Sequence, residues 1–158
     1  MRIREYQETD RRDLKEITII CFKGVSIDEN VEECFGQIAG KNWAWRKERQ
    51  MDDDIAVNPN GIFVAEEDGN PIGYITTRVD QVTKVGRIPN LGVLPAYRNS
   101  GIGRKLMARA SAHLRSESMK CVRIETLEQN AVGQRFYPSC GFKEVARQIH
   151  YIRRLDIT

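Results

Sequence analysis

Several features are missing from this sequence of 158 residues, and each absence excludes a class of protein. No stretch approaches the roughly 18 consecutive apolar residues of a membrane-spanning helix, and the first residues, MRIREYQETD, lack the apolar core of a secretion signal. The four cysteines show no C-x-x-C spacing and there are only two histidines, which disfavours a zinc site. We therefore expect no membrane span, no metal, and a cytoplasmic protein with reduced thiols.

Strong charge of one sign is also missing. The chain has 25 lysines and arginines against 22 aspartates and glutamates, which gives a net charge of +3. A nucleic-acid-binding domain usually shows a basic stripe with interleaved aromatic residues, so we expect no nucleic-acid partner. The length fits one hydrophobic core, and we expect residues 1–158 to form a single domain.

Hydrophobic periodicity predicts helices and strands in alternation. Helices are expected after Asp10 and over residues 29–50, 101–117 and 130–137. Strands are expected over residues 2–6, 62–67, 71–79, 84–93 and 121–127, with a closing strand over 142–154. The DDD run at 52–54 is expected to be a solvated turn. This order predicts an α+β (mixed α/β) domain around one sheet, with a β-α-β crossover in its second half.

A basic elbow with two glycines joins an apolar strand to an amphipathic helix. Its sequence, RNSGIG, is followed by two more cations, Arg104 and Lys105. A helix N-terminus offers backbone N–H groups and a positive dipole end, and glycine lets an anion approach the backbone closely. The elbow fits neither G-x-G-x-x-G, which needs glycine where Leu106 stands, nor a P-loop. From these residues alone the elbow is either a phosphate site or a helix-start turn with surface cations.

The residues around the elbow resemble the acetyl-CoA-binding signature of the GNAT superfamily of N-acetyltransferases. That signature is a strand ending in L-x-V-x-P-x-[YW]-R, then x-x-G-[IL]-G and a helix, and it is matched by Leu91, Val93, Pro95, Tyr97, Arg98, Gly101 and Gly103. A second signature of the family, an Asn at a helix start followed by F-Y-x-x-x-G-F, is matched by Asn130, Phe136, Tyr137, Gly141 and Phe142. Two motifs at the expected separation are more specific than either one.

The resemblance implies a fold, a cosubstrate and a reaction. The GNAT fold has a single central mixed, mostly antiparallel sheet with a splayed parallel strand pair, here 84–93 and 120–127, flanked by about four helices. Acetyl-CoA would lie between the splayed strands as cosubstrate. Its acetyl group would pass directly, in a ternary complex, to a primary amine of a small molecule or a peptide.

The resemblance also implies roles for individual residues. Leu91, Gly92 and Val93 would lie along the pantetheine arm, and the Val93 N–H would donate to the thioester carbonyl and to the oxyanion formed on attack. The pyrophosphate would be held by Arg98, Asn99, Ser100, Gly101, Ile102, Gly103 and Arg104. Asn130 would bond to the pantetheine arm, and Tyr137 would protonate the departing CoA thiolate.

Some points stay open in the sequence. Asn130 is also suited to be a helix N-cap, and Tyr137 to be a half-buried aromatic residue, with Pro138 ending or bending the helix directly after it. The general base is not identified among the carboxylates Asp28, Glu29, Glu32, Glu33, Glu66, Glu67 and Asp80. The acceptor and a homodimer are left open, and the alternative function is a catalytically idle acyl-CoA-binding or regulatory module.

Overall fold

Four antiparallel strands form the centre of the protein in the computed structural model, which describes residues 1–157. Their order across the sheet is β1 (Arg2–Glu5), β2 (Ile62–Glu67), β3 (Asn70–Thr76) and β5 (Leu91–Val93). Two further strands, β4 (Val85–Arg87) and β6 (Cys121–Arg123), pair in parallel. The chain runs from β4 directly into β5, which joins the parallel pair to the antiparallel sheet. The expected mixed, mostly antiparallel sheet with a parallel strand pair is confirmed.

Five α-helices are present within residues 1–157, one more than expected: α1 (Arg11–Phe22), α2 (Ile27–Phe35), α3 (Trp43–Val57), α4 (Ile102–Ser116) and α5 (Ala131–Ser139). Single 3₁₀ turns form η1 (Glu8–Asp10), η2 (Pro59–Gly61) and η3 (Pro95–Tyr97). The region 29–50 divides into two helices because Gly36 and Gly40 both adopt a φ of 70°. The Asn42 side chain then accepts from Trp45 N at 2.9 Å and caps α3. No helix of the described chain is both long and apolar enough to cross a membrane.

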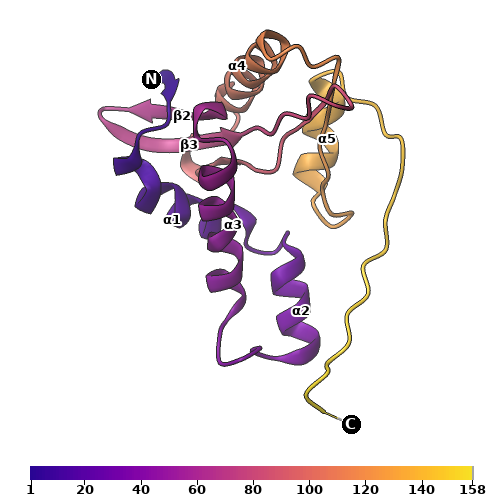
Figure 1. Ribbon diagram of the computed structural model, residues 1–158. Coiled ribbons are helices and arrows are strands. Elements are labelled where there is room, and N and C mark those ends of the chain that lie inside the picture. Colours follow the sequence, from indigo (N-terminus) through magenta and orange to yellow (C-terminus); the bar gives the residue numbers. More distant parts are fainter. Residues whose placement is uncertain (158) are drawn as a thin grey trace.

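The sheet separates two hydrophobic clusters because successive side chains of β2 point to opposite faces. Phe63 and Ala65 belong to the cluster that includes Leu106 of α4. Ile62 and Val64 belong to the cluster formed with α1 and α3. Figure 1 shows the corresponding layers, with α4 on one face of the sheet and α1 and α3 on the other. The helices thereby fix the sheet from both sides.

The closing strand expected over residues 142–154 is wrong. Residues 143–157 leave α5 as an extended segment that makes no backbone hydrogen bond with any part of residues 1–157 (Figure 1). The strand over 121–127 is also shorter than expected, since β6 ends at Arg123. Alternating apolar and polar side chains favour a strand, but a strand also needs a neighbouring backbone to pair with. The alternation in this segment is therefore present without the pairing.

The solvated turn expected at 52–54 is wrong as well, because these residues lie within α3. Asp54 is only 3% exposed. Its carboxylate accepts from Thr76 Oγ1 at 2.9 Å, from Arg78 Nη2 at 2.8 Å and from Asn90 Nδ2 at 2.7 Å. A run of like charges usually indicates solvated surface, but here three hydrogen-bond donors offset the cost of desolvating one carboxylate.

Candidate active site

A β-bulge separates β4 from β5 and changes which backbone groups face the neighbouring strands. In the β3–β5 ladder Ile75 faces Leu91, and continuing that register would put Ile88 opposite Arg78. Arg87 stands opposite Arg78 instead, so one extra residue lies between the two pairings. Within residues 1–157, the final bond toward β6 runs from Ile88 N to the carbonyl of the last β6 residue at 3.0 Å. β5 and the chain after β6 diverge from this point.

Leu91 and Val93 direct their backbone groups into the opening between the diverging strands. Asn90 O accepts from β3 and Leu94 N donates to β3, each at 2.9 Å, so the even-numbered residues bond to β3. Backbone groups alternate along an antiparallel strand, and the N–H and C=O of the odd-numbered residues therefore face the other edge. We call Leu91 and Val93 the open edge. A ligand with amide groups can pair with such an edge as an added strand does.

Gly92 differs from its two neighbours. It pairs with Tyr74 of β3, so its backbone groups point away from the opening. A Cβ at this position would lie 3.3 Å from the sulfur of Cys21 and 3.3 Å from the ring of Tyr74. Glycine at this position therefore lets α1 approach the sheet closely. The sequence grouped Gly92 with the cofactor contacts, whereas the structure gives it this packing role.

The elbow between η3 and α4 forms a cup of backbone N–H groups. Asn99, with a φ of 61°, and Gly101, with a φ of 83°, adopt the left-handed conformation, which turns successive N–H groups toward one side. Within residues 1–157 the N–H groups of residues 99–104 meet no hydrogen-bond acceptor, and no side chain caps α4. We call residues 99–104 the amide loop. Together with the positive end of the α4 dipole, it provides a site for an anion such as phosphate.

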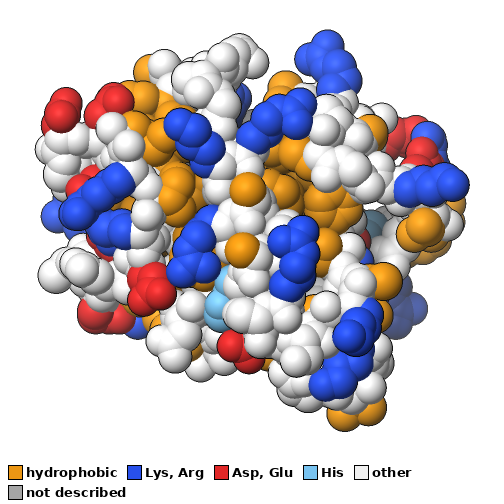
Figure 2. All heavy atoms as spheres, turned by 90° about the horizontal axis from the view of Figure 1, so that it is seen from above, with side chains coloured by type: hydrophobic (Ala, Val, Ile, Leu, Met, Phe, Trp, Pro, Cys, Tyr) orange, Lys and Arg blue, Asp and Glu red, His pale blue; other side chains and the backbone are white. Residues whose placement is uncertain are grey.

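The cations near the amide loop point toward its margins. Arg98 Nε donates to Val93 O at 2.9 Å, which places its guanidinium beside the open edge and not over the loop. Arg104 Nη1 donates to Ser139 O, at the end of α5, also at 2.9 Å. The Ile102 side chain is buried in the core, so only its backbone belongs to the loop. Further Lys and Arg side chains stand among hydrophobic groups on the face that carries α4 (Figure 2).

Gly103 lies where α4 packs closely against α5. A Cβ on Gly103 would lie 3.2 and 3.3 Å from two ring carbons of Phe136, which is tighter than ordinary van der Waals contact. The sequence assigned this glycine to the close approach of an anion. The structure directs its open side at Phe136, so only its N–H belongs to the amide loop.

Asn130 is the N-cap of α5. Its Oδ1 accepts from Gly133 N at 3.0 Å, and its Nδ2 donates to Thr126 Oγ1 at 2.9 Å. A Cβ on Gly133 would lie 2.7 Å from the Asn130 side chain, so this glycine makes room for the cap. Both ends of the Asn130 amide are thus engaged within the protein. Of the two roles left open by the sequence, the structure supports the helix cap.

Tyr137 combines a packed ring with an available hydroxyl. The ring makes edge-to-face contacts with Phe136 at 5.5 Å and with Phe142 at 6.0 Å between centroids. Burial, with a smaller contribution from Cys140, raises the pKa of Tyr137 to about 12, so the hydroxyl stays protonated at neutral pH. Within residues 1–157 this hydroxyl makes no hydrogen bond. Pro138 follows within α5, and the helix ends one residue later.

The family model described as the acetyltransferase (GNAT) family matches residues 25–142. The chain belongs to this family. The matched range contains the bulge, the open edge, the amide loop and α5. The resemblance noted in the sequence is therefore confirmed.

Curated relatives of this GNAT chain are longer than the part they share with it. The chain is 29% identical to the mycothiol acetyltransferase of Thermobispora bispora, over 71% of this chain and 40% of that protein. It is 34% identical to the mycothiol acetyltransferase of Thermomonospora curvata, over 60% of this chain and 31% of that protein. An uncharacterized N-acetyltransferase of Archaeoglobus fulgidus is 32% identical over 54% of this chain and 61% of its own length. The match thus spans less than half of either mycothiol acetyltransferase.

Solved structures share the fold of this GNAT chain. The PaiA N-acetyltransferase of Thermoplasma acidophilum, in complex with coenzyme A, superposes with a TM-score of 0.72 at 22% identity over 90% of this chain and 89% of that one. An apo aminoglycoside 6'-N-acetyltransferase of Acinetobacter haemolyticus gives 0.65 at 19% identity over 99% and 100%. A GNAT acetyltransferase of Brucella melitensis, in complex with acetyl-CoA, gives 0.60 at 21% identity over 90% and 82%. At these identities the likeness concerns the fold.

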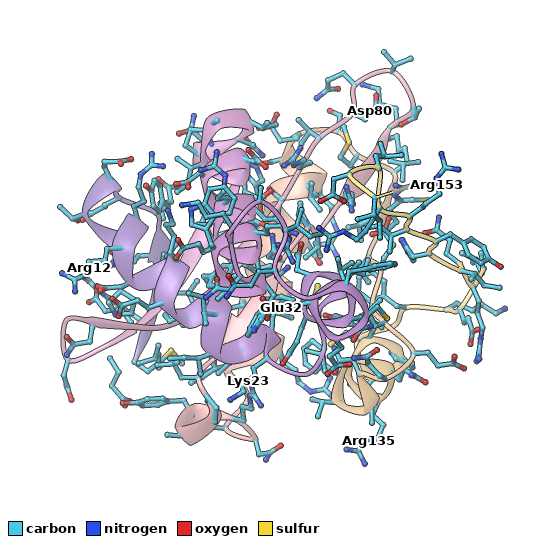
Figure 3. All side chains as sticks on the ribbon, turned by 90° about the horizontal axis from the view of Figure 1, so that it is seen from below. Arg12, Lys23, Glu32, Asp80, Arg135 and Arg153 are labelled. Atoms are coloured by element: carbon cyan, nitrogen blue, oxygen red, sulfur yellow. The ribbon has the colours of Figure 1, made fainter. Side chains whose placement is uncertain are left out.

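Several carboxylates considered as a base in this GNAT protein make structural contacts instead. Glu66 bonds to two arginines of β1. Asp80 accepts from two N–H groups of its own loop, and Figure 3 shows it at the opposite end of the molecule from Arg135 of α5. Asp28 lies 3.5 Å from an arginine of α3, and Glu32 accepts from the first N–H of α3 at 3.2 Å. Asp28 and Glu32 therefore fix α2 against α3.

A buried lysine is the main feature that the sequence did not reveal. Lys47 of α3 is 6% exposed, and its Nζ donates to Gln50 Oε1 at 2.7 Å and to Asn90 Oδ1 at 3.1 Å. It also lies 3.8 Å from the ring centre of Phe22. Burial lowers the pKa of Lys47 to about 8, although Asp54 and a second aspartate oppose this. Asn90 directly precedes the open edge, so this polar network supports β5 from the α3 side.

Proposed function

We propose that the protein is an acetyl-CoA-dependent N-acetyltransferase that moves an acetyl group to a primary amine by direct attack in a ternary complex. The observation that carries this proposal is the presence of two sets of unpaired backbone N–H groups in one stretch of chain, the open edge at Leu91 and Val93 and the amide loop at residues 99–104. Coenzyme A presents amide groups along its pantetheine arm and then a pyrophosphate. Amide acceptors suit the open edge, and a pyrophosphate suits the amide loop, so the residues present fit this cosubstrate.

The open edge has a chemical as well as a binding role in this proposal. The Val93 N–H donates to the thioester carbonyl oxygen and, as the amine attacks, to the negative charge that develops there. The attacking nitrogen gains a bond to the acetyl carbon and passes a proton to water, while the bond between that carbon and sulfur breaks. Arg98, bonded to Val93 O, holds a positive charge next to the following peptide unit, the one that contains the Val93 carbonyl. This guanidinium steadies the edge and attracts the anionic cosubstrate.

Tyr137 supplies the proton that the departing sulfur needs. Its hydroxyl is protonated at neutral pH because burial raises the pKa of Tyr137 to about 12. The aromatic contacts of its ring limit the positions that the hydroxyl can take. After transfer, the phenolate would regain a proton from water. Because the amine itself attacks the thioester, no acetyl-enzyme is needed.

The acceptor is proposed to be a small-molecule amine. Relatives named for mycothiol, and solved neighbours named for aminoglycosides, support this class over a peptide. An amine also needs to be neutral to attack. A lysine-type amine with a pKa near 10.4 loses about 4–5 kcal/mol in this step at pH 7, whereas an amine with a pKa near 8 loses about 1 kcal/mol. Amines of lower pKa are therefore the better first choice.

The proposal is tested by measuring CoA release from acetyl-CoA with a panel of amines, which includes amino sugars, polyamines and a short peptide. The expected result is release that depends on one class of amine, with a product heavier by one acetyl group in mass spectrometry. Binding of acetyl-CoA without transfer to any amine would favour the idle acyl-CoA-binding module. Failure to bind acetyl-CoA would contradict both functions.

A further inference from the structure

Three arginines stand in a row across neighbouring strands at the closed end of the opening. Arg78 and Arg87 are partners in an antiparallel bridge, and Arg87 is the parallel partner of Arg123. Residues directly opposite each other in a ladder project to the same face of the sheet. We call these three residues the arginine row. Arginine keeps its charge at neutral pH, and like charges directly opposite each other destabilise a sheet, so the requirements of folding do not explain the row.

The arginine row projects to the side of the sheet that carries α3. Arg78 Nη2 donates to Asp54 of α3 at 2.8 Å. Gly86, next to Arg87, faces the other side, because a Cβ on it would lie 2.8 Å from Leu114 of α4. The amide loop lies at the start of α4, so a cosubstrate held there reaches the opening from the α4 side. The α3 side, with the arginine row, remains for the acceptor amine.

A groove of about 410 Å³ runs along the arginine row. The row lines it together with residues of the connection between β3 and β4, among them Asp80. Asp80 Oδ1 already accepts from two N–H groups of its own loop, at 2.9 and 3.1 Å. In the part of the chain that the structure describes, the lining of this groove thus carries three arginines against one aspartate.

The guanidinium groups of the row retain N–H donors for a ligand. Arg78 Nε is buried and meets no acceptor within residues 1–157. Arg87 Nε and Arg123 Nη2 share the carboxylate of Glu125, at 3.3 and 3.2 Å, which engages one nitrogen of each. A guanidinium presents its N–H groups as a planar fork that matches two oxygens of a carboxylate or a phosphate. The arginine row therefore suits an oxyanion.

The row also lies within reach of the reaction that the open edge would support. Glu125 follows β6 by two residues, so its contacts draw two guanidinium groups toward the opening. Allowing for the bulge, Leu91 lies about 10 Å beyond Arg87 along the chain, at a rise of about 3.3 Å per residue. We propose that the arginine row binds an anionic group, a carboxylate or a phosphate, of the acceptor, whose amine then lies in the opening. This inference rests on the proposed function and narrows its acceptor to amines that also carry an anionic group.

Matched amines with and without an anionic group test this inference. Glucosamine 6-phosphate is compared with glucosamine, and ornithine with putrescine, so the first pair tests a phosphate and the second a carboxylate. We expect kcat/KM to favour the anionic member of at least one pair at least about tenfold, through charge-assisted hydrogen bonds to the row. Arg87→Gln/Arg123→Gln should reduce that preference at least about fivefold. These two side chains are 45% and 64% exposed, so the double variant should keep the circular dichroism of the parent.

Arg12→Gln/Arg115→Gln is the matched control, since it removes the same charge from exposed positions on α1 and α4. It should change the preference by less than about twofold, because neither position lines the groove. Equal or better use of the neutral amine in both pairs would overturn the inference. A preference for the anionic amine that survives Arg87→Gln/Arg123→Gln would overturn it as well.

Phosphate binding distinguishes a failure of this inference from a failure of the proposed function. Inorganic phosphate is titrated into ¹⁵N-labelled protein saturated with coenzyme A, which occupies the amide loop, and the arginine Nε–H signals are observed. We expect saturable changes at the arginine row that are absent from Arg87→Gln/Arg123→Gln. Such binding without acetylation of any amine would support the anion site but contradict the proposed function, and the assignment to an acceptor would fail with it. No saturable change at the row at millimolar phosphate would overturn the inference whichever amines are acetylated.

Discussion

Tyr137 is the residue on which the proposed chemistry depends most directly. Its hydroxyl is the only part of the side chain that the proton transfer needs, while the ring packs between Phe136 and Phe142. Removing only the oxygen therefore separates the chemical role from the packing role. The same substitution tests whether Pro138, which directly follows Tyr137 in α5, leaves the hydroxyl in a position to transfer its proton.

For Tyr137→Phe we expect kcat to fall at least about tenfold, since general-acid catalysis contributes roughly 10²–10⁴-fold and a CoA thiolate is already a fair leaving group. Acetyl-CoA affinity should change by less than about threefold. Steady-state kinetics and titration calorimetry measure the two quantities. Tyr6→Phe, in the segment after β1, is the matched control and should leave both unchanged. Full kcat in a folded Tyr137→Phe variant would remove this residue from the mechanism.

The buried lysine gives a second prediction at this scale. In the unfolded chain Lys47 keeps its proton up to its ordinary pKa of 10.5, whereas in the folded protein it loses the proton near pH 8. Between these pH values the unfolded state binds more protons, so raising the pH stabilises the folded state. Relative to Lys47→Met, the parent should gain about 2–3 kcal/mol of unfolding free energy between pH 8 and pH 10.

Urea unfolding of both proteins across this pH range provides the measurement. The comparison cancels the titration of groups that the two proteins share. A stability difference that is independent of pH would mean that Lys47 keeps its proton in the folded protein.

The positions of site residues could be predicted from the sequence only where a motif determines the backbone conformation. Leu91, Val93 and the amide loop follow from the L-x-V and G-x-G spacing, because the motif specifies backbone conformation. The directions of Arg98 and Arg104, and the contact between Gly103 and Phe136, depend on the packing of α4 against β5 and α5. No local pattern in the sequence encodes these contacts.

At the scale of elements, the start of α4 makes the strongest contribution to the site. Gly101 is left-handed and directly precedes a 15-residue helix, and no side chain within residues 1–157 caps that helix. The N–H groups at the N-terminus of α4 are therefore directed at one position. A negative charge introduced there should compete with a bound phosphate. A negative charge at the other end of the same helix should not.

We therefore expect Ser100→Glu to weaken acetyl-CoA binding at least about tenfold, which corresponds to about 1.4 kcal/mol, through like-charge repulsion in the amide loop. Ser116→Glu changes the net charge equally at the C-terminal end of α4 and should alter affinity by less than about threefold. Titration calorimetry distinguishes the two. Equal losses in both variants would point to a general effect of charge and away from a pyrophosphate at the loop.

Element types were predictable where a helical or strand period is long and strong, as in α1, α4, β2 and β3. The C-terminal segment also has a strand-like period, yet no strand forms there within residues 1–157. Periodicity describes which side chains share a face, whereas a strand also requires a partner backbone that lies far away in sequence. The same reason explains why the bulge between β4 and β5, which creates the open edge, could not be located from the sequence.

At the scale of the whole molecule, helices on both faces hold the sheet, and the two strands that diverge at the bulge leave an opening in it. Because acetyl-CoA would bind the folded protein and not the unfolded chain, it should stabilise the fold. At 100 times its dissociation constant the gain is about 2.7 kcal/mol, or roughly 5–10 °C in melting temperature for a chain of this size. Scanning calorimetry should show this rise with acetyl-CoA, and adenosine, which lacks the pyrophosphate, should give little or none.

The most direct test of the proposed site is an NMR titration of ¹⁵N-labelled protein with acetyl-CoA, which observes the backbone N–H groups themselves. We predict saturable binding with the largest shift changes at Leu91, Val93 and the N–H groups of the amide loop. Small changes are expected at β1 and at the loop around Asp80. Saturable binding with the largest changes elsewhere, or no binding at millimolar acetyl-CoA, would contradict the proposed site.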